Sequence, residues 1–183
     1  MDKSGFPSFS DDFGAPRSGG RTHAGNDIFA KRGTPVFAVR DGIARNAVTN
    51  LGGNSVFLTS SDGTRFFYSH LDAFGPNGQA PGKIFPVKSG DVLGFVGDTG
   101  NAKGTPPHLH FQMADKDGPP VNPFPFLTEL ATPGTVFTRK PSNGSKATSS
   151  PATTAAASFG GFGTLLLLWA AWQYFGKGRR RAA

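Results

Sequence analysis

Short strand-like stretches, some apolar throughout and some alternating between apolar and polar residues, run through the first two thirds of the chain and are separated by turn residues. They cover residues 36–39, 55–59, 64–70, 91–96 and 108–113. A period of two, bounded by Gly, Pro, Asn and Asp, is typical of half-buried β-strands. Asp41-Gly42 and Asp62-Gly63 favour hairpin turns, and no helix-length amphipathic run precedes residue 159. The pattern predicts an all-β fold, a small antiparallel β-sandwich or barrel.

The stretch 108–113 also carries two of the four histidines in the chain. Side chains two apart in a strand point to the same face, so His108 and His110 share one face while Leu109 and Phe111 share the other, apolar one. Two imidazoles on one face suit a metal site, a proton-transfer site or one of each. They also suit the solvated face of an antiparallel sheet, and the alternation alone leaves these alternatives open.

A third histidine, His23, precedes a carboxylate, Asp27, by four residues. Gly25 and Asn26 between them disfavour a helix, so we expect a tight loop. Such a loop can still bring an imidazole and a carboxylate to one point. The alternative is a surface histidine followed by a turn aspartate.

The fourth histidine, His70, is expected to end the strand 64–70. In a regular strand Phe66, Tyr68 and His70 share one face. The alternative to a functional role is a half-buried histidine whose ring nitrogen is satisfied by the backbone.

Composition and charge narrow the classes of function. The chain has 183 residues and a formal net charge of +7, but Lys177 and residues 179–181 supply four of those charges. Residues 1–158 hold 15 basic and 12 acidic residues, a weak bias that does not indicate a nucleic-acid partner. The absence of cysteine excludes thiolate zinc ligands, a cysteine nucleophile and disulfides.

The character of the chain changes after residue 131. Residues 132–158 are rich in Pro, Thr, Ser, Ala, Gly and Asn, which predicts a flexible linker. Residues 159–175 contain no charge and predict a C-terminal transmembrane helix near the lower length limit, with the lipid bilayer as partner. Trp172 and Tyr174 suit its interface with water, and a basic tail follows at 176–183. The alternative is a buried C-terminal helix.

Several motifs, taken together and in order, resemble the lysostaphin-type zinc metallopeptidases, the M23 peptidase family. They lie at residues 21–28, 33–36, 41–42, 68–71, 96–100, 108–111 and 121–123. The resemblance covers roughly residues 6–127. It implies a small antiparallel β fold with a groove, one Zn²⁺ per chain, and cleavage of peptide bonds in peptidoglycan. We therefore expect an irregular lead-in at 1–20, with a few aromatic side chains packed on the domain, and a peptidase domain at 21–131.

The resemblance also assigns roles to the four histidines. His23, Asp27 and His110 match the metal ligands, whereas His70 and His108 match the two catalytic histidines that do not bind the metal. Two imidazoles and one carboxylate make a three-ligand zinc site with a position left for water. Zinc lowers the pKa of that water to ~7. Which of His70 and His108 is the general base stays open.

Two positions depart from the family pattern. Gln112 stands where an acidic residue often follows His-Leu-His-Phe, and we expect it to alter a contact behind the metal site or the substrate preference. Asn26 occupies a position that is often apolar.

The expected function is a membrane-anchored zinc endopeptidase that hydrolyses peptide cross-links of peptidoglycan, with its catalytic domain facing the cell envelope, in the periplasm or outside. No signal peptide is visible in residues 1–20, and the basic tail is expected to stay on the cytoplasmic or particle-interior side. One alternative is a non-catalytic wall-binding or scaffold module of the same fold. Another is a hydrolase carried in a virion membrane and used in host entry or lysis.

Overall fold

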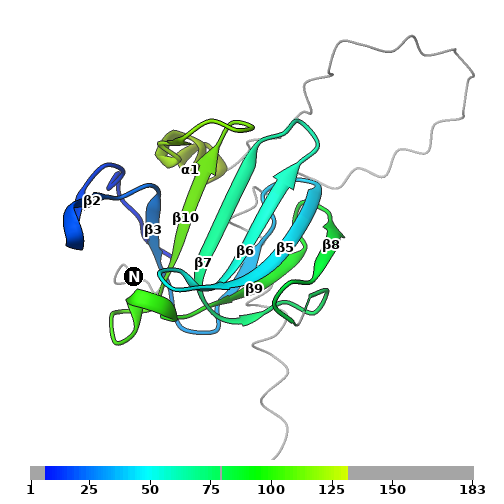
Figure 1. Cartoon of the computed structure of the whole chain (residues 1–183), viewed down its shortest axis with the longest axis horizontal. Coiled ribbons are helices and arrows are strands. Elements are labelled where there is room, and N and C mark those ends of the chain that lie inside the picture. The colour runs from blue at the N-terminus through cyan, green and yellow to red at the C-terminus, as the bar shows by residue number, and fades with distance from the viewer. Residues whose placement is uncertain (1–6, 79, 132–183) are drawn as a thin grey trace, which may run out of the picture.

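The computed structural model describes residues 7–78 and 80–131 (Figure 1). In chain order the elements are β1 (Pro16–Arg17), the 3-10 turn η1 (Ser18–Gly20), β2 (Arg21–Thr22), β3 (Asn26–Phe29), β4 (Pro35–Phe37), β5 (Gly42–Thr49), β6 (Gly53–Ser60), β7 (Arg65–Phe74), β8 (Ile84–Val87), β9 (Val92–Val96), the 3-10 turn η2 (Gly100–Ala102), β10 (His108–Ala114), β11 (Pro120–Val121) and α1 (Phe124–Ala131).

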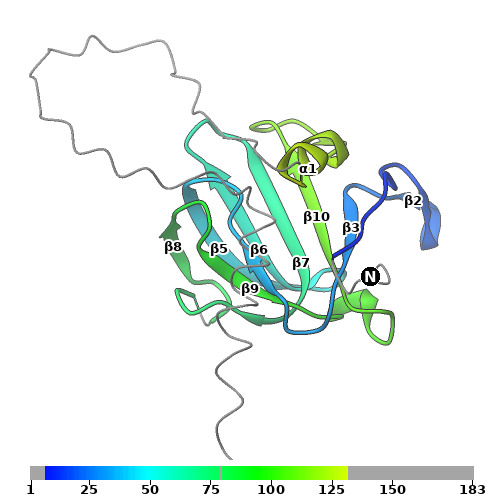
Figure 2. The same ribbon diagram turned by 180° about the vertical axis from the view of Figure 1, so that it is seen from behind.

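Nine of the strands form one antiparallel sheet, whose main path runs β11-β10-β7-β6-β5-β8. Strand β3 pairs with β10, while β9 pairs with the far end of β7 and carries β4 on its other edge. Both views show β9 crossing one face of the layer made by β7, β6 and β5 (Figure 1 and Figure 2). The sheet is thus folded over on itself, which confirms the prediction of a small antiparallel β fold.

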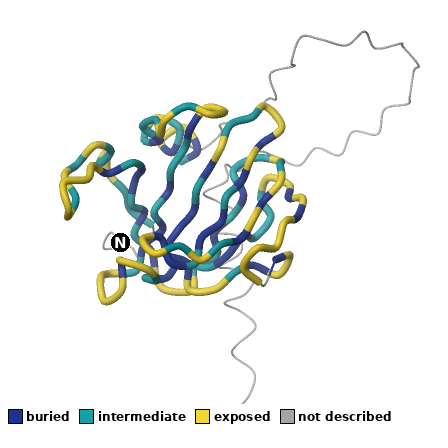
Figure 3. Tube along the Cα trace, viewed as in Figure 1, coloured by how far each residue is buried: buried dark blue, intermediate teal, exposed yellow. Residues whose placement is uncertain are grey.

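The hydrophobic core lies between the two layers. Alternate residues of β6, β7 and β10 point into it and are at most 2% exposed: Val56, Leu58, Phe66, Tyr68 and Phe111. Each such side chain contributes roughly 1.5–3 kcal/mol of transfer free energy on burial. The Tyr68 hydroxyl accepts a hydrogen bond from the Val39 N–H at 3.2 Å and so joins the layers. Figure 3 shows the result, with buried segments inside and exposed ones in the loops.

The prediction that His70 shares a strand face with Phe66 and Tyr68 is wrong, because β7 is not a regular strand. Its pairing with β6 passes from Tyr68↔Val56 to Leu71↔Asn54, so β7 holds one extra residue at this point, a β-bulge. His70 sits in the bulge with a left-handed φ of 64°. Its side chain therefore lines the groove described below instead of following Phe66 and Tyr68 into the core. The strand also does not end at His70 but continues to Phe74.

Two local predictions about turns have different outcomes. Asp62-Gly63 joins the paired strands β6 and β7, as predicted. The hairpin predicted at Asp41-Gly42 is wrong, because β4 pairs with β9 whereas β5 pairs with β6 and β8. The dipeptide instead carries the chain from one layer to the other. Which strands pair is decided by contacts between distant segments, and local turn propensity does not predict them.

The helix α1 was not predicted, since eight residues are too few to show an amphipathic period. The Asn122 side chain accepts a hydrogen bond from the Phe124 N–H at 2.9 Å, which satisfies one free donor at the start of the helix. Leu127 and Leu130 are buried against the core. Phe9 of the lead-in packs edge-on against Phe124, as the expectation of an aromatic contact required.

No helix within residues 7–78 and 80–131 is long and apolar enough to cross a membrane. The predicted linker, transmembrane helix and basic tail at 132–158, 159–175 and 176–183 lie outside the described residues. They stay predictions, as do the proposed domain boundaries.

Candidate metal centre

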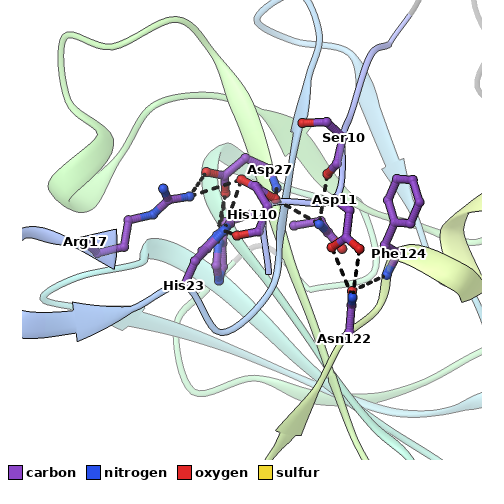
Figure 4. Close-up of polar contacts among 10 residues, drawn as sticks. Ser10, Asp11, Arg17, His23, Asp27, His110, Asn122 and Phe124 are labelled. Carbon is purple, nitrogen blue, oxygen red and sulfur yellow. Dashed lines mark hydrogen bonds and ion pairs between the residues drawn. The ribbon is translucent and has the colours of Figure 1, made fainter. Parts of the chain in front are cut away.

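Three side chains meet at the end of β3, two of them four residues apart in the chain and the third from a distant strand. Asp27 on β3 and His110 on β10 are direct cross-strand partners, and His23 reaches them from the loop that precedes β3 (Figure 4). The His110 Nδ1 atom lies 2.9 Å from the Asp27 Oδ1 atom and 2.8 Å from the His23 Nε2 atom. The remaining pair, His23 Nε2 and Asp27 Oδ1, is 3.1 Å apart. One ligand atom from each residue therefore faces a common point.

This group could hold a metal ion, and its donors fit zinc. Zinc bound at about 2.0–2.2 Å to nitrogen and oxygen in a tetrahedron separates its ligand atoms by about 3.3 Å. The three separations of 2.8, 2.9 and 3.1 Å fall a few tenths of an ångström short of that value. A small outward shift of the side chains is enough to reach it. Among the described residues, no other cluster of three or more histidine and carboxylate side chains brings its ligand atoms close enough together to hold a metal ion.

The other two histidines stand beside this group. The ring centroid of His70 is 5.8 Å from that of His110 and 4.9 Å from that of His108. The Nδ1 atom of His70 is 2.9 Å from the Thr99 carbonyl oxygen, and that of His108 is 2.8 Å from the Pro106 carbonyl oxygen. Because a carbonyl only accepts, Nδ1 carries a hydrogen in both rings, and in the neutral form of each ring Nε2 has the free lone pair.

All four histidines line one groove, with a volume of about 630 Å³. Its floor is the face of β10 and β7 that carries His110, Ser69 and Phe67, and its rim includes Leu51 and Asn101 from the loops. The expectation that His108 and His110 share a face that is not the core is confirmed. An open groove of this size admits an extended chain beside the three converging donor atoms.

Residues 21–123 match peptidase family M23. The chain belongs to this family. The match covers more than half of the 183 residues and contains every histidine of the groove. The prediction of a peptidase is thereby confirmed at the level of the family.

Relatives and solved structures agree with this membership. The chain is 43% identical over 104 residues to the DD-carboxypeptidase/endopeptidase Mpg of Neisseria meningitidis, which is 56% of this chain and 22% of Mpg. It is 40% identical over 114 residues to the glycyl-glycine endopeptidase ALE-1 of Staphylococcus capitis, 59% of this chain and 30% of ALE-1. The chain thus spans less than a third of either relative.

The fold also matches the catalytic domain of the antimicrobial peptidase lysostaphin from Staphylococcus simulans. The TM-score is 0.56 at 34% sequence identity, and the match covers 67% of this chain and 92% of that domain. The described part of this M23 chain therefore corresponds to nearly the whole of a peptidase domain.

A hydrogen bond behind the site sets the tautomer of His23. The Nδ1 atom of this buried ring lies 3.0 Å from the carbonyl oxygen of Asp12 and 3.1 Å from its Oδ2 atom. Both oxygens only accept, so Nδ1 carries a hydrogen. Nε2, which faces Asp27 and His110, is therefore the nitrogen that can bind a metal once it has lost its own proton.

The two oxygens of Asp27 have different partners. Oδ1 faces the histidines, whereas Oδ2 accepts a hydrogen bond from Arg17 at 2.8 Å. Burial alone would raise the pKa of this carboxyl, but hydrogen bonds to His110 and His23 lower it well below its usual range. Asp27 is therefore an anion with one oxygen directed at the candidate metal position.

The imidazoles differ in basicity according to their neighbours. Burial opposes protonation of His23, but the hydrogen bond and charge of Asp27, together with those of Asp12, raise its pKa. Burial lowers the pKa of His110, and Asp27 offsets this only in part. Burial also lowers the pKa of His70, to about 4, with His108 and His110 adding to the effect.

The sequence analysis missed two residues of the site, Asp12 and Arg17. Both lie in the lead-in 1–20, which was expected to be irregular, and both precede the family match at 21–123. No period or spacing in that segment links them to His23 or Asp27. The only available signal was the presence of charged side chains in a segment rich in Gly, Ser and Phe.

Proposed function

We propose that this chain is a zinc-dependent endopeptidase that hydrolyses peptide cross-links of peptidoglycan. The observation that carries the proposal is the convergence of His23, Asp27 and His110 on one point, beside two imidazoles that keep a free Nε2. In this proposal the first three residues hold the zinc ion. His70 and His108 act on the substrate without binding the ion.

A bound zinc ion would supply Lewis acidity and lower the pKa of a water molecule in the site to ~7. The chain's own residues supply the proton transfers. His70 and His108 are held through Nδ1 by backbone carbonyls, so each can accept a proton at Nε2 and return it. Hydrolysis of an amide needs both events, since the attacking water loses a proton and the departing amine gains one.

Mpg is named a DD-carboxypeptidase/endopeptidase and ALE-1 a glycyl-glycine endopeptidase, so related domains are named for different bonds. Phe67 and Gln112 border the groove next to His110. In this proposal they help to determine which substrate the chain accepts. Gln112 brings no charge there, consistent with its expected effect on substrate preference.

The test is digestion of defined cross-linked muropeptides by the full chain, with the products identified by mass spectrometry. Cleavage of a peptide cross-link that a zinc chelator stops and added zinc restores supports the proposal. A chain that binds peptidoglycan but neither holds zinc nor releases products is the non-catalytic module instead. Comparing muropeptides with direct cross-links and with glycine bridges assigns the bond.

We also propose that residues 159–175 anchor the enzyme in a lipid bilayer with the peptidase domain facing the cell envelope. The support is the sequence alone: 17 uncharged residues followed at once by four cations. Added protease should remove residues 1–131 from intact cells or spheroplasts and spare the tail. Recovery of the intact chain in purified particles would support the virion alternative, and protection of residues 1–131 would reverse the topology.

A further inference from the structure

The lead-in forms a strap, residues 8–17, that runs along the outside of β3 next to the candidate metal centre. Its first end is held by two backbone hydrogen bonds between Ser8 and Phe29, at 3.0 and 2.8 Å. Further along, Gly14 N–H donates to the His23 carbonyl at 2.7 Å and His23 N–H donates to the Ala15 carbonyl at 2.8 Å. The strap is therefore tied to the backbone on both sides of Asp27.

Asp12 sits in the middle of the strap and contacts the residues around the centre through every oxygen it has. Its Oδ1 atom accepts hydrogen bonds from the Asn26 side chain, at 2.8 Å, and from the backbone nitrogen of Asp27, at 3.4 Å. Its carbonyl and Oδ2 face the His23 Nδ1 atom. Asn26 has no exposed surface, so this contact is a buried polar link between strap and β3.

Arg17, at the far end of the strap, joins the two carboxylates. Its guanidinium is 3.1 Å from Asp12 Oδ2 and 2.8 Å from Asp27 Oδ2. Both contacts come from one nitrogen, Nη2, and these charge-assisted hydrogen bonds restrain the direction of both carboxylates. With Oδ2 of Asp27 held in this way, Oδ1 is the oxygen that remains for the candidate metal position (Figure 4).

We propose that Asp12 and Arg17 are positioning residues for the metal centre: Asp12 orients and polarises His23, and Arg17 orients Asp27. A carboxylate on the far nitrogen of a metal-binding imidazole fixes its orientation and raises its basicity, and loss of such a partner costs about 10–100-fold in metal affinity. This inference rests on the metal site of the proposed function. It assigns part of that site to a segment outside the family match at 21–123.

The experiment measures zinc affinity of the full chain by competition with a chromophoric chelator. Asp12→Ala and Arg17→Met should each weaken zinc binding about 10–100-fold. Arg17→Lys should recover part of the loss, because it keeps the positive charge but not the planar guanidinium. Thermal unfolding of the metal-free variants reports separately whether the fold is retained.

Asp11→Ala is the matched control. Asp11 is the neighbouring carboxylate of the same strap, but it accepts its hydrogen bonds from Asn122, at 3.0 and 3.1 Å, away from the centre. This variant should bind zinc like the unchanged chain. Equal losses in the Asp11 and Asp12 variants would mean that the strap only anchors the fold, and wild-type affinity in the Asp12 and Arg17 variants would overturn the inference. Absence of zinc binding in the unchanged chain would instead contradict the proposed function itself.

Discussion

The two halves of the groove use the same side chain in opposite settings. His23 and His110 share an anion, Asp27, and behind His23 stands a second carboxylate, Asp12. His70 and His108 face backbone carbonyls, at Thr99 and Pro106. The first half is suited to hold a cation. The second half, called neutral here because its rings face uncharged carbonyls, is suited to exchange protons. The role proposed for each imidazole therefore follows from whether a carboxylate faces it, more than from its distance to the other rings.

The largest expected effect comes from removing a candidate ligand from the anionic half of the groove, which consists of His23, Asp27 and His110. Asp27→Ala or His110→Ala leaves only two protein donors, so zinc and activity should disappear together. Metal analysis of the purified variants and muropeptide digestion check this. Stoichiometric zinc in either variant would contradict the assignment of these residues as ligands.

Removing either imidazole of the neutral half, His70 or His108, should leave the metal in place. His70→Ala and His108→Ala each keep all three candidate ligands but remove a proton carrier, so turnover should fall about 10²–10⁴-fold. Zinc content measured on the same samples separates the two effects. If the His108 variant loses its metal, the roles of His108 and His110 have been exchanged.

Acid should affect the candidate metal ligands and His70 at different pH values. Zinc binding requires deprotonated His23 and His110, so occupancy falls as protons compete for these rings. Burial keeps the pKa of His70 at about 4, and this ring therefore stays neutral throughout mildly acidic solution. Activity and zinc occupancy measured from pH 7 to pH 4.5 should decline together, and added zinc should restore both. An activity loss with full zinc occupancy would place the sensitive group in the neutral half.

The smallest expected effect is on the stability of the metal-free chain. His70 and His23 should change the free energy of unfolding with pH in opposite directions. His70 has a lower pKa in the folded than in the unfolded state, where it is about 6.5. The unfolded chain binds more protons between pH 6.5 and about 4, so His70 makes the free energy of unfolding fall as pH decreases through that window. His23 has a raised pKa and contributes stability that is present below pH ~6.5 and is lost above its folded pKa.

Urea unfolding at several pH values, with chelator present, tests these signs. His70→Gln should weaken the loss of stability on acidification, by up to about 3 kcal/mol at pH 4. His23→Gln should make that loss steeper. If both variants changed the pH dependence of the free energy of unfolding in the same direction, the two rings would have similar electrostatic surroundings.

Sequence reasoning succeeded where structure follows local alternation. The strand 108–113 places His108 and His110 on one face and buries Phe111, as a period of two requires. It failed where one residue breaks the period, because the bulge at His70 turns that side chain away from the face of Phe66 and Tyr68. A regular pattern carries no sign of a single left-handed residue.

The site itself was found only in part. The resemblance to a family brought His23, Asp27 and His110 together, since residues 87 positions apart share no local pattern. Asp12 and Arg17 were missed because their contacts depend on how the lead-in lies across β3. That arrangement follows from backbone pairing between distant segments, which neither composition nor spacing reports.

The most direct test is a crystal structure of the zinc-loaded protein with anomalous diffraction measured at the zinc absorption edge. The account predicts one zinc peak, bonded to His23 Nε2, Asp27 Oδ1 and His110 Nδ1 at about 2.0–2.2 Å, with His70 and His108 unbonded. A peak bonded to His70 or His108, or none among the three predicted ligands, would contradict it.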